Sequence, residues 1–330
     1  MTLAPPNKPS VERLVDGPIV SPASHPSIGA NIQGPSLVRV PDWVESPLGR
    51  YYLYFADHKG RYIRLAYADR LTGPWTVHVP GALHLEDTPF PHEPPTVSTE
   101  QVHNAEELRQ ASDGPILHSA AYEMTTPHIA SPDVHVDAAT RRFVMYYHGL
   151  ESAGRQVSRV AVSGDGLVFE SGTEILGRTY MRVFRYRDMT HALAMPGLFY
   201  RSTDPLGGFE EGPRLFNPDM RHAAVMLRGD MLYVFWTQVG DTPERILLST
   251  VDLRGDWMAW QASEPVEVLR PERSWEGADA PLEPSVRSVA YGMVNQLRDP
   301  AVYEERDDVY LLYAVAGESG IALARVAFPH

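Results

Sequence analysis

Short apolar runs of strand length dominate this chain, and turn-forming residues separate them. The runs are rich in Val, Tyr, Phe and Leu, and Gly, Asp and Pro stand between them. Helical periodicity sustained over about twelve or more residues is hard to find. The one candidate helix covers Asn104 to Ala111. The pattern therefore predicts an all-β chain.

One unit of strands recurs along the sequence. It consists of an entry strand, a polar turn, an aromatic-rich second strand and a third strand in which small and apolar residues alternate. Five such units cover residues 33–79, 133–170, 181–209, 222–251 and 300–326. Four-stranded units of roughly 40 to 50 residues are typical of propeller blades, because each blade buries its faces only against its neighbours. We therefore predict a single five-bladed β-propeller over residues 28–330; the alternative is a two-sheet sandwich with a small added domain.

The fifth unit shows only three strands. An isolated apolar run, Val11 to Val15, lies in the arm formed by residues 1–27 and could pair beside Ile321 to Val326. This pairing would close the ring and remove two exposed sheet edges. Two long gaps between strands, at about 84–127 and 261–296, are rich in Pro, Glu and polar residues. We expect both to form loops on one face of the propeller.

Composition narrows the class of ligand. The chain has 42 acidic and 29 basic residues, and no basic run is interleaved with aromatic residues. Nucleic acid and anionic membranes are therefore not expected partners. No apolar stretch approaches the ~20 residues of a spanning helix and the N-terminus lacks the apolar core of a signal peptide, so we expect a cytoplasmic protein. With 0 cysteines, the chain has no disulfide, thiolate metal site or cysteine nucleophile.

Polar residues gather at one end of the predicted blades. First strands begin and second strands end on the same face of the disc, because adjacent strands are antiparallel. One central funnel would bring these positions together. The residues concerned are Gln33, Asp57, His58, Asp133, His148, Arg182, Arg221, His222, Gln238, Arg298, Asp299 and Glu318.

Three phrases carry a resemblance to a known group of enzymes. They are GPSLVRVPD with YYLYFADH, SPDVHVDAATRRFVMYYHG, and RDPAVYEERDDVYLLYAVAGESGIALA. In these phrases the chain resembles the five-bladed propeller glycoside hydrolases, the broad group that holds families 43, 62, 32, 68, 117 and 130. The sharpest motif is Asp299-Pro300 in the last blade. The resemblance implies a glycosidase whose partner is a small carbohydrate.

The chain departs from family 43 at the positions that carry catalysis there. The resemblance would place an Asp before Pro as base, a second Asp before Pro as modulator and a Glu as acid in a later blade. Here Gly34 and Ser131 precede the prolines, and Arg221 with His222 stands near the position of the acid. In family 117 a histidine is thought to be the general acid, and His222 would be its analogue.

Glycoside hydrolysis needs a proton donor at the leaving oxygen and a carboxylate that activates water or attacks the sugar. We expect His222 or a nearby carboxylate as the donor and Asp133 or Asp299 as the base, within one pocket that also holds His148. The other carboxylate candidates are Glu283 and Glu318. Substrate contacts are expected from Gln33, Asp57, His58, His148, Arg182, Arg221, Gln238, Arg298 and Glu318.

Each of these residues also has an ordinary structural role open to it. Asp299 could accept backbone N–H bonds in a turn, and a buried histidine is often satisfied by a carbonyl group. The arginines Arg182, Arg221 and Arg298 could be salt-bridge partners, or their guanidinium groups could bind the carboxylate of an acidic sugar. The aromatic pairs Tyr51-Tyr52 and Tyr146-Tyr147 fit the blade core better than a sugar platform.

The leading hypothesis is an exo-acting glycosidase on a small oligosaccharide, acidic sugars included. One alternative is a propeller that binds sugar or protein without chemistry. Another is a metal-assisted hydrolase, a lyase or an isomerase in the same funnel. No HExxH or comparable spacing is present, so we expect no metal and no cofactor, with an axial calcium or other divalent ion as the alternative. The oligomeric state is left open.

Overall fold

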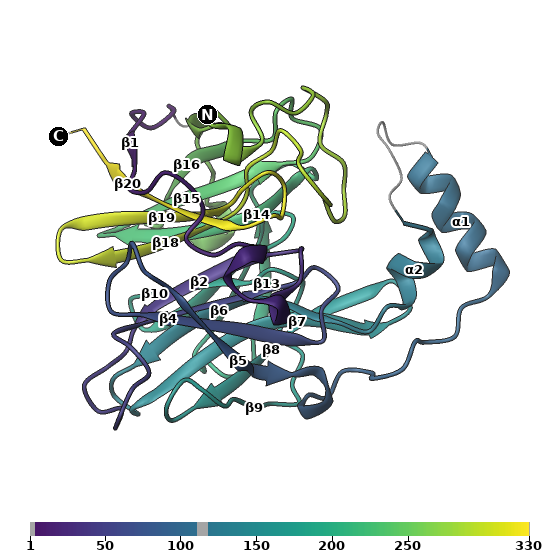
Figure 1. Ribbon diagram of the computed structural model, residues 1–330, viewed down its shortest axis with the longest axis horizontal. Helices are drawn as coiled ribbons and strands as arrows, with labels where there is room; N and C mark the ends of the chain where they lie inside the picture. The colour runs from purple at the N-terminus through teal and green to yellow at the C-terminus, as the bar shows by residue number, and fades with distance from the viewer. Residues whose placement is uncertain (1–3, 111–117, 330) are drawn as a thin grey trace.

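The computed structural model describes residues 4–110 and 118–329. Five four-stranded antiparallel sheets form a five-bladed β-propeller, which confirms the predicted fold (Figure 1). The first two blades are β2 (Gln33–Arg39), β3 (Tyr51–Ala56), β4 (Tyr62–Ala68), β5 (Thr76–His84) and β6 (Ile129–Asp137), β7 (Arg142–Ser152), β8 (Arg155–Ser163), β9 (Glu170–Ser171). The next two are β10 (Arg182–Tyr186), β11 (Met189–Ala194), β12 (Leu198–Ser202), β13 (Glu210–Arg214) and β14 (Met220–Arg228), β15 (Met231–Gln238), β16 (Ile246–Asp252), β17 (Val266–Leu269). The fifth contains β18 (Arg298–Glu305), β19 (Asp308–Ala314), β20 (Ile321–Ala327) and β1 (Ser10–Arg13).

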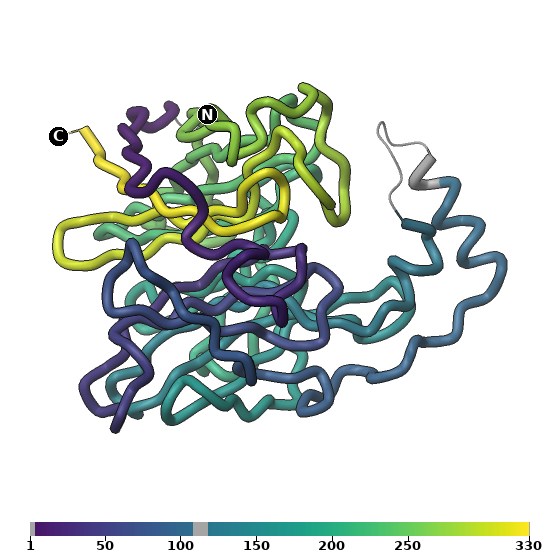
Figure 2. Tube along the Cα trace, in the orientation of Figure 1, coloured from purple at the N-terminus to yellow at the C-terminus, as the bar shows by residue number. Residues whose placement is uncertain are grey.

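A strand from the N-terminal arm closes the ring, as the missing strand of the fifth unit predicted. Strand β1 pairs antiparallel with β20, from Ser10 opposite Ala327 to Arg13 opposite Ala324. The strand begins one residue before the predicted run and ends at Arg13. Two segments from opposite ends of the sequence therefore lie side by side in the Cα trace (Figure 2).

The blades pack through aromatic and branched side chains that alternate along their strands. Between the first two blades, Tyr52 stacks on Phe143 with ring centroids 6.4 Å apart, and both rings are fully buried. Tyr51, Tyr146 and Tyr147 are also buried. The tyrosine pairs are thus part of the blade core, which a sheet with both faces covered requires.

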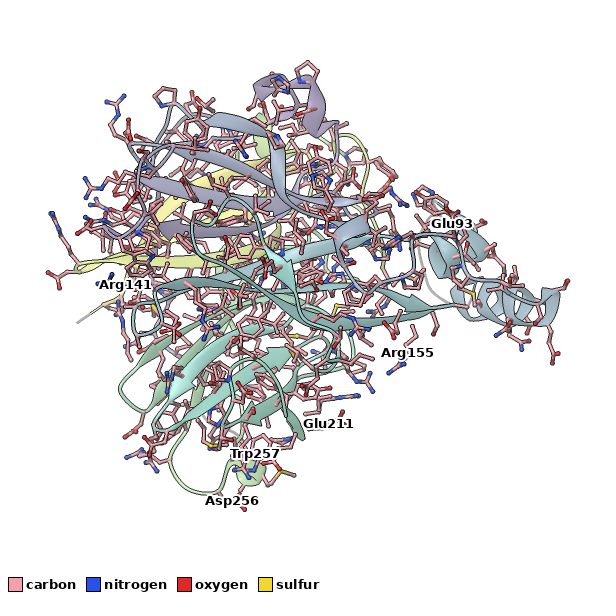
Figure 3. The ribbon with its side chains drawn as sticks, turned by 90° about the horizontal axis from the view of Figure 1, so that it is seen from below. Glu93, Arg141, Arg155, Glu211, Asp256 and Trp257 are labelled. Atoms are coloured by element: carbon pink, nitrogen blue, oxygen red, sulfur yellow. The ribbon has the colours of Figure 1, made fainter. Side chains whose placement is uncertain are left out.

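The first long gap carries two helices, α1 (Thr99–Gln110) and α2 (Ala120–Thr125). Helix α1 begins before the predicted helix at Asn104, and the predicted end at Ala111 lies outside the described residues. Seen from below in Figure 3, this insertion projects to one side of the propeller, near the labelled Glu93. None of the described helices is long and apolar enough to cross a membrane.

The second long gap is not only a loop. It supplies β17, the fourth strand of the fourth blade, and a turn of 3-10 helix at Ser274–Glu276. Further 3-10 turns elsewhere in the chain are Pro22–Ser24, Pro26–Ile28, Leu85–Asp87 and Trp257–Ala259. The expectation of a loop over 261–296 was wrong for β17, because four residues are too few to show a clear alternation.

Candidate functional site

In each blade, one residue at or just before the start of the innermost strand adopts a left-handed backbone conformation. The five φ angles are 62° at Gly34, 52° at Ser131, 61° at Tyr180, 39° at His222 and 47° at Asp299. In four blades the register between the first and second strands shifts at this position. Non-glycine residues rarely adopt this conformation, and it is often kept at functional sites. The fivefold repetition identifies equivalent positions around the axis.

At Gly34, where the family 43 resemblance would place the base, the neighbouring residue Ser131 leaves little room for a side chain. A Cβ atom on Gly34 would lie 3.0 Å from the Cα atom and 3.4 Å from the Oγ atom of Ser131. A larger side chain would also be strained at this positive φ. The packing of the first two blades therefore disfavours any side chain larger than glycine at position 34.

Asp299, Tyr180 and His222 form one buried cluster. The Tyr180 hydroxyl is hydrogen-bonded to Asp299 Oδ1 and lies 2.8 Å from Gln33 Oε1. His222 Nε2 lies 3.6 Å from the same Asp299 oxygen. Asp299 is 1% exposed, and its Oδ2 atom has no hydrogen-bond partner among the described residues. A polar group of a ligand would supply the missing partner.

Burial sets the protonation of this cluster in opposite directions. Burial, together with the negative charge of Glu318, raises the pKa of Asp299 to about 6. Burial, together with the positive charges of Arg221 and Arg298, holds the pKa of His222 well below its ordinary value. Burial and the Asp299 charge raise the pKa of Tyr180. Near neutral pH, His222 and Tyr180 are uncharged, and Asp299 titrates closest to that pH.

Glu318 and His58 form a second pair beside the cluster. Glu318 accepts hydrogen bonds from Asn31 Nδ2 at 2.7 Å and from Arg298 Nη1 at 2.8 Å. Its Oε1 atom lies 3.4 Å from His58 Nδ1. Burial opposes the charge of Glu318, yet His58 and Arg298 outweigh it and lower the pKa of Glu318 to about 2. The His58 side chain remains 20% exposed, so it is more accessible than Asp299 or Glu318.

The three arginines of the predicted funnel are engaged by the protein. Arg221 makes a two-pronged ion pair with Glu244, with Nε 2.9 Å from Oε1. Arg298 binds Glu318 and the Gln296 side-chain oxygen. Arg182 donates to the carbonyl oxygens of Ala223 and Pro132, at 2.8 and 2.7 Å. These contacts fit the structural role of the arginines, since no complete guanidinium fork is left for a substrate carboxylate.

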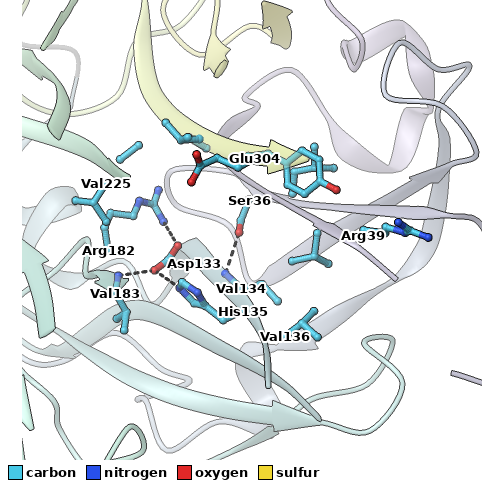
Figure 4. A pocket seen from close by; sticks show the side chains of 16 residues that line it. Ser36, Arg39, Asp133, Val134, His135, Val136, Arg182, Val183, Val225 and Glu304 are labelled. Atoms are coloured by element: carbon cyan, nitrogen blue, oxygen red, sulfur yellow. Dashed lines mark hydrogen bonds and ion pairs between the residues drawn. The ribbon is translucent and has the colours of Figure 1, made fainter. Parts of the chain in front are cut away.

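Asp133 does not join the other predicted catalytic residues. Its Oδ2 atom accepts hydrogen bonds from Val183 N at 2.8 Å and from His135 Nε2 at 2.9 Å, and it lines a separate axial cavity (Figure 4). The expectation of one shared pocket was wrong for Asp133. Ser131 occupies the position equivalent to Asp299, and two residues of extended strand carry Asp133 further along the axis.

The remaining predicted contacts fall into two groups. His148 lies beside Tyr180, with ring centroids 5.1 Å apart, and burial with the charge of neighbouring groups lowers its pKa well below the ordinary value. Asp57 is held by Arg64 at 3.4 Å. Gln238 accepts from Asn217, away from the cluster contacts, and Glu283 is exposed.

Tyr180 and Glu244 are the site residues that sequence reasoning missed. The third blade opens with Tyr180-Met181 and has no proline to mark the turn, so its irregular pattern hid the equivalence. The signal that could have found Tyr180 is its place two residues before Arg182, since Ser131 also stands two residues before Asp133. Glu244 follows a polar loop, and only the pairing with Arg221 reveals it.

A search of family models found no match for this chain. A relative is 34% identical over 322 residues, which cover 90% of this chain and 83% of the relative: Uncharacterized protein R118 of Acanthamoeba polyphaga mimivirus. The chain belongs to the R118 family. Within the described residues of the present chain, no group of three or more His, Cys, Asp or Glu side chains is placed to hold a metal ion.

Solved structures similar to this R118-family protein are propeller glycoside hydrolases. A hydrolase of the GH130 family of mannoside phosphorylases, described as targeting β-1,2 mannosidic linkages in Candida mannan, is 13% identical, with a TM-score of 0.62 over 100% of this chain and 97% of that chain. A glycosyl hydrolase from Bacteroides ovatus is 12% identical, with a TM-score of 0.61 over 98% and 94%. CoXyl43, a GH43 β-xylosidase/α-arabinofuranosidase from a compost metagenome, is 12% identical, with a TM-score of 0.55 over 97% and 94%. These likenesses confirm the resemblance at the level of fold.

Proposed function

We propose that the protein is a glycoside hydrolase-like enzyme that acts on the end of a small oligosaccharide at the mouth of the propeller. One observation carries this proposal: Asp299, buried at the left-handed position of the fifth blade, has a raised pKa of about 6 and one oxygen without a partner among the described residues. Glycosidases use such a carboxyl group to protonate the leaving oxygen. The fold shared with glycoside hydrolases supports this interpretation.

The sequence-based expectation gave the donor role to His222 or a nearby carboxylate and the base role to Asp299 or Asp133. The lowered pKa of His222 leaves its imidazole neutral and without the acidic proton at neutral pH, which favours a carboxylate as donor. Asp299 keeps its proton to higher pH than an ordinary carboxyl group. We therefore assign the donor role to Asp299, with His222 and Tyr180 positioning its carboxyl group.

A base is needed on the other side of the sugar. His58 fits this role because Glu318, an ionised and buried carboxylate, holds its Nδ1 side while part of the ring stays exposed. A carboxylate that orients an imidazole in this way is a recurring arrangement in hydrolases. His58 would remove a proton from the attacking water.

The insertions favour a short substrate. Glu123 of α2 pairs with Lys59 Nζ at 2.9 Å and accepts a hydrogen bond from Ser288 of the second insertion. Both insertions therefore meet next to His58 at the mouth. This arrangement supports end-on access by a small oligosaccharide, and the engaged arginines favour a neutral sugar over an acidic one.

The experiment is a screen of purified protein against aryl glycosides and neutral oligosaccharides. With a substrate found, Asp299→Asn and His58→Ala should each lower the rate about 10²- to 10⁴-fold. Asp307→Asn, on the exposed turn of the same blade, is the control and should keep the parental rate. A correctly folded Asp299→Asn variant with near-parental turnover would remove Asp299 from the mechanism.

The second candidate function is sugar binding without chemistry. Gly34 and Ser131 favour it, because they replace two of the carboxylates that the family resemblance implies. This function predicts that the screen finds saturable sugar binding, measured by calorimetry, and no release of product.

A further inference from the structure

The propeller axis contains a polar cavity that is separate from the Asp299 cluster. It has a volume of about 390 Å³ and is lined by all five innermost strands. Its lining residues follow the left-handed residues in sequence: Ser36 follows Gly34, Asp133 follows Ser131, and Arg182 follows Tyr180. Because an extended strand advances about 3.3 Å per residue, the cavity lies further along the axis than the cluster.

Arg182 and Asp133, which both line this cavity, have unused hydrogen-bonding capacity. Arg182 is 3% exposed, and its Nη2 atom has no hydrogen-bond partner within residues 4–110 and 118–329. Asp133 Oδ1 lies 3.9 Å from Arg182 Nη1, whereas the other Asp133 oxygen already accepts two hydrogen bonds. Figure 4 shows the guanidinium and the carboxylate side by side. A buried donor and a neighbouring acceptor without partners call for a ligand with both kinds of group.

Charged residues around the cavity are paired within the protein. Asp133 lies 2.9 Å from His135 and 3.9 Å from Arg182, Arg39 lies 3.7 Å from Glu305, and Glu304 lies 3.6 Å from Arg228. Aliphatic residues, among them Val134, Val183 and Val225, also line the cavity. Charges that are already paired, together with this aliphatic lining, favour a neutral molecule over an anion or a cation.

We propose that this cavity binds a small neutral polyol, such as a single sugar unit, through a pair of adjacent hydroxyl groups. One hydroxyl oxygen accepts from Arg182 Nη2, and the neighbouring hydroxyl donates to Asp133 Oδ1. The Ser36 hydroxyl, whose oxygen accepts from Val134 N at 2.8 Å, has its own proton free to donate to a third oxygen. The C–H faces of the polyol pack on the valines. This site does not depend on catalysis at Asp299.

The proposal is tested by titrating the full chain with D-xylose, D-mannose and D-glucose, followed by saturation-transfer NMR. Val225→Phe fills the cavity from its wall and should raise the Kd of the bound sugar at least about tenfold. Val168→Phe is the matched control, since Val168 is 72% exposed on another blade. Asp133→Asn, which replaces an acceptor oxygen by a donor, should weaken binding similarly. Asp299→Asn should leave this binding unchanged, which separates the axial site from the proposed catalytic site.

Four outcomes would overturn the proposal. The first is the absence of saturable binding of any of the three sugars up to about 100 mM. The second is binding that Val225→Phe leaves at parental strength in a variant that melts like the parent. The third is loss of the sugar signal in Asp299→Asn alone. Tighter binding of phosphate or acetate at the same cavity would instead identify an anion site and reject the polyol.

Discussion

At the scale of single residues, a repeated backbone conformation decides which side chains meet on the axis. Ser131, Tyr180, His222 and Asp299 all have positive φ, and each non-glycine residue in this conformation costs of order 1 kcal/mol or more. The cost recurs in four of five blades at the same place. The strained backbone therefore sets the direction in which these four side chains point toward the axis. Gly34 has the same conformation at the equivalent position of the first blade.

The packing at Gly34 gives the first prediction. Gly34→Ala places a Cβ atom 3.0 Å from the Ser131 backbone and should lower the free energy of unfolding by about 2 kcal/mol or more. Gly229→Ala is the control, because Gly229 has a similar φ of 60° and open space around its Cβ position. Urea unfolding of both variants isolates the steric contribution. Equal losses at the two sites would show that Ser131 yields without cost.

The raised pKa of Asp299 gives the second prediction. A carboxyl group whose pKa rises from 3.8 to about 6 on folding favours the native state below pH 4, and this contribution is lost as the pH rises to 6. Above that range the buried charge costs up to roughly 3 kcal/mol. Asp299→Asn should therefore be more stable than the parent at pH 8, and the difference should shrink towards pH 4. Urea unfolding at several pH values measures it, with Asp307→Asn as the exposed control; a pH-independent difference would contradict the shift.

Sequence reasoning reached part of this cluster for a physical reason. Asp299 and His222 stand at blade openings that the strand pattern made visible, and His148 follows the clear aromatic run of the second strand β7. Asp133 was misplaced because a two-residue offset along an extended strand changes the depth on the axis, and composition does not reveal that offset. Tyr180 was missed because tyrosine before a strand is equally typical of a core.

At the scale of elements, β1 has only 4 residues, and the side chain of Arg13 contributes more to holding it in the ring than its short strand pairing does. Arg13 Nε and Nη2 lie 2.7 and 2.8 Å from the Glu276 carboxylate, which is fully buried and also accepts from Tyr313 at 2.9 Å. A buried carboxylate without its partner is strongly unfavourable. The strand and the second insertion are therefore coupled through this ion pair.

This coupling gives the third prediction. Arg13→Met should lower the free energy of unfolding by about 3 to 5 kcal/mol, because Glu276 would remain buried without a cation. Arg325→Met breaks the exposed Arg325–Glu12 pair of the same two strands and should cost no more than about 1 kcal/mol. Chemical denaturation compares the two. Similar losses would mean that strand pairing, and not the buried ion pair, dominates.

The insertions give the fourth prediction. Burial opposes the charge of Glu123, but Lys59 and Ser288 outweigh it and lower its pKa, so the ionised form holds α2 at the mouth. Glu123→Gln should weaken this contact and raise hydrogen exchange in α2 severalfold. Glu107→Gln on α1, where Glu107 pairs with His103 at a largely exposed site, is the control. Unchanged exchange in the Glu123→Gln variant would show that other contacts hold α2.

Elements were predicted best where both faces of a strand are buried. Strands β3, β7 and β19 contain continuous apolar and aromatic runs, and the sequence indicated all three. The short strand β17 and helix α2 were missed, since neither has enough residues to show its period. The missing fourth strand of the last blade was itself informative, because it predicted β1.

At the scale of the whole molecule, the repeated strand pattern made the propeller fold predictable. The residues on the axis follow no such pattern and were harder to predict. Structures only 12 to 13% identical share this propeller over nearly the full chain. A blade requires only buried alternation and turns, which many sequences satisfy. The axial residues carry no such constraint from the fold, so Gly34 and Tyr180 could occupy positions that another propeller fills differently.

The closing pair of strands also determines how the molecule would respond to tension. Ser10 pairs with Ala327, and the pairing continues inward to Arg13 opposite Ala324. A force applied at these two outer residues in opposite directions would therefore load the hydrogen bonds one after another, as in a zipper, and not all at once as in shear. Rupture would begin at the Ser10–Ala327 end and travel until it reached Arg13, whose ion pair with Glu276 would bear the next load. The closing strands would thus separate easily at the Ser10–Ala327 end. They would resist more strongly at Arg13, the fourth residue of β1.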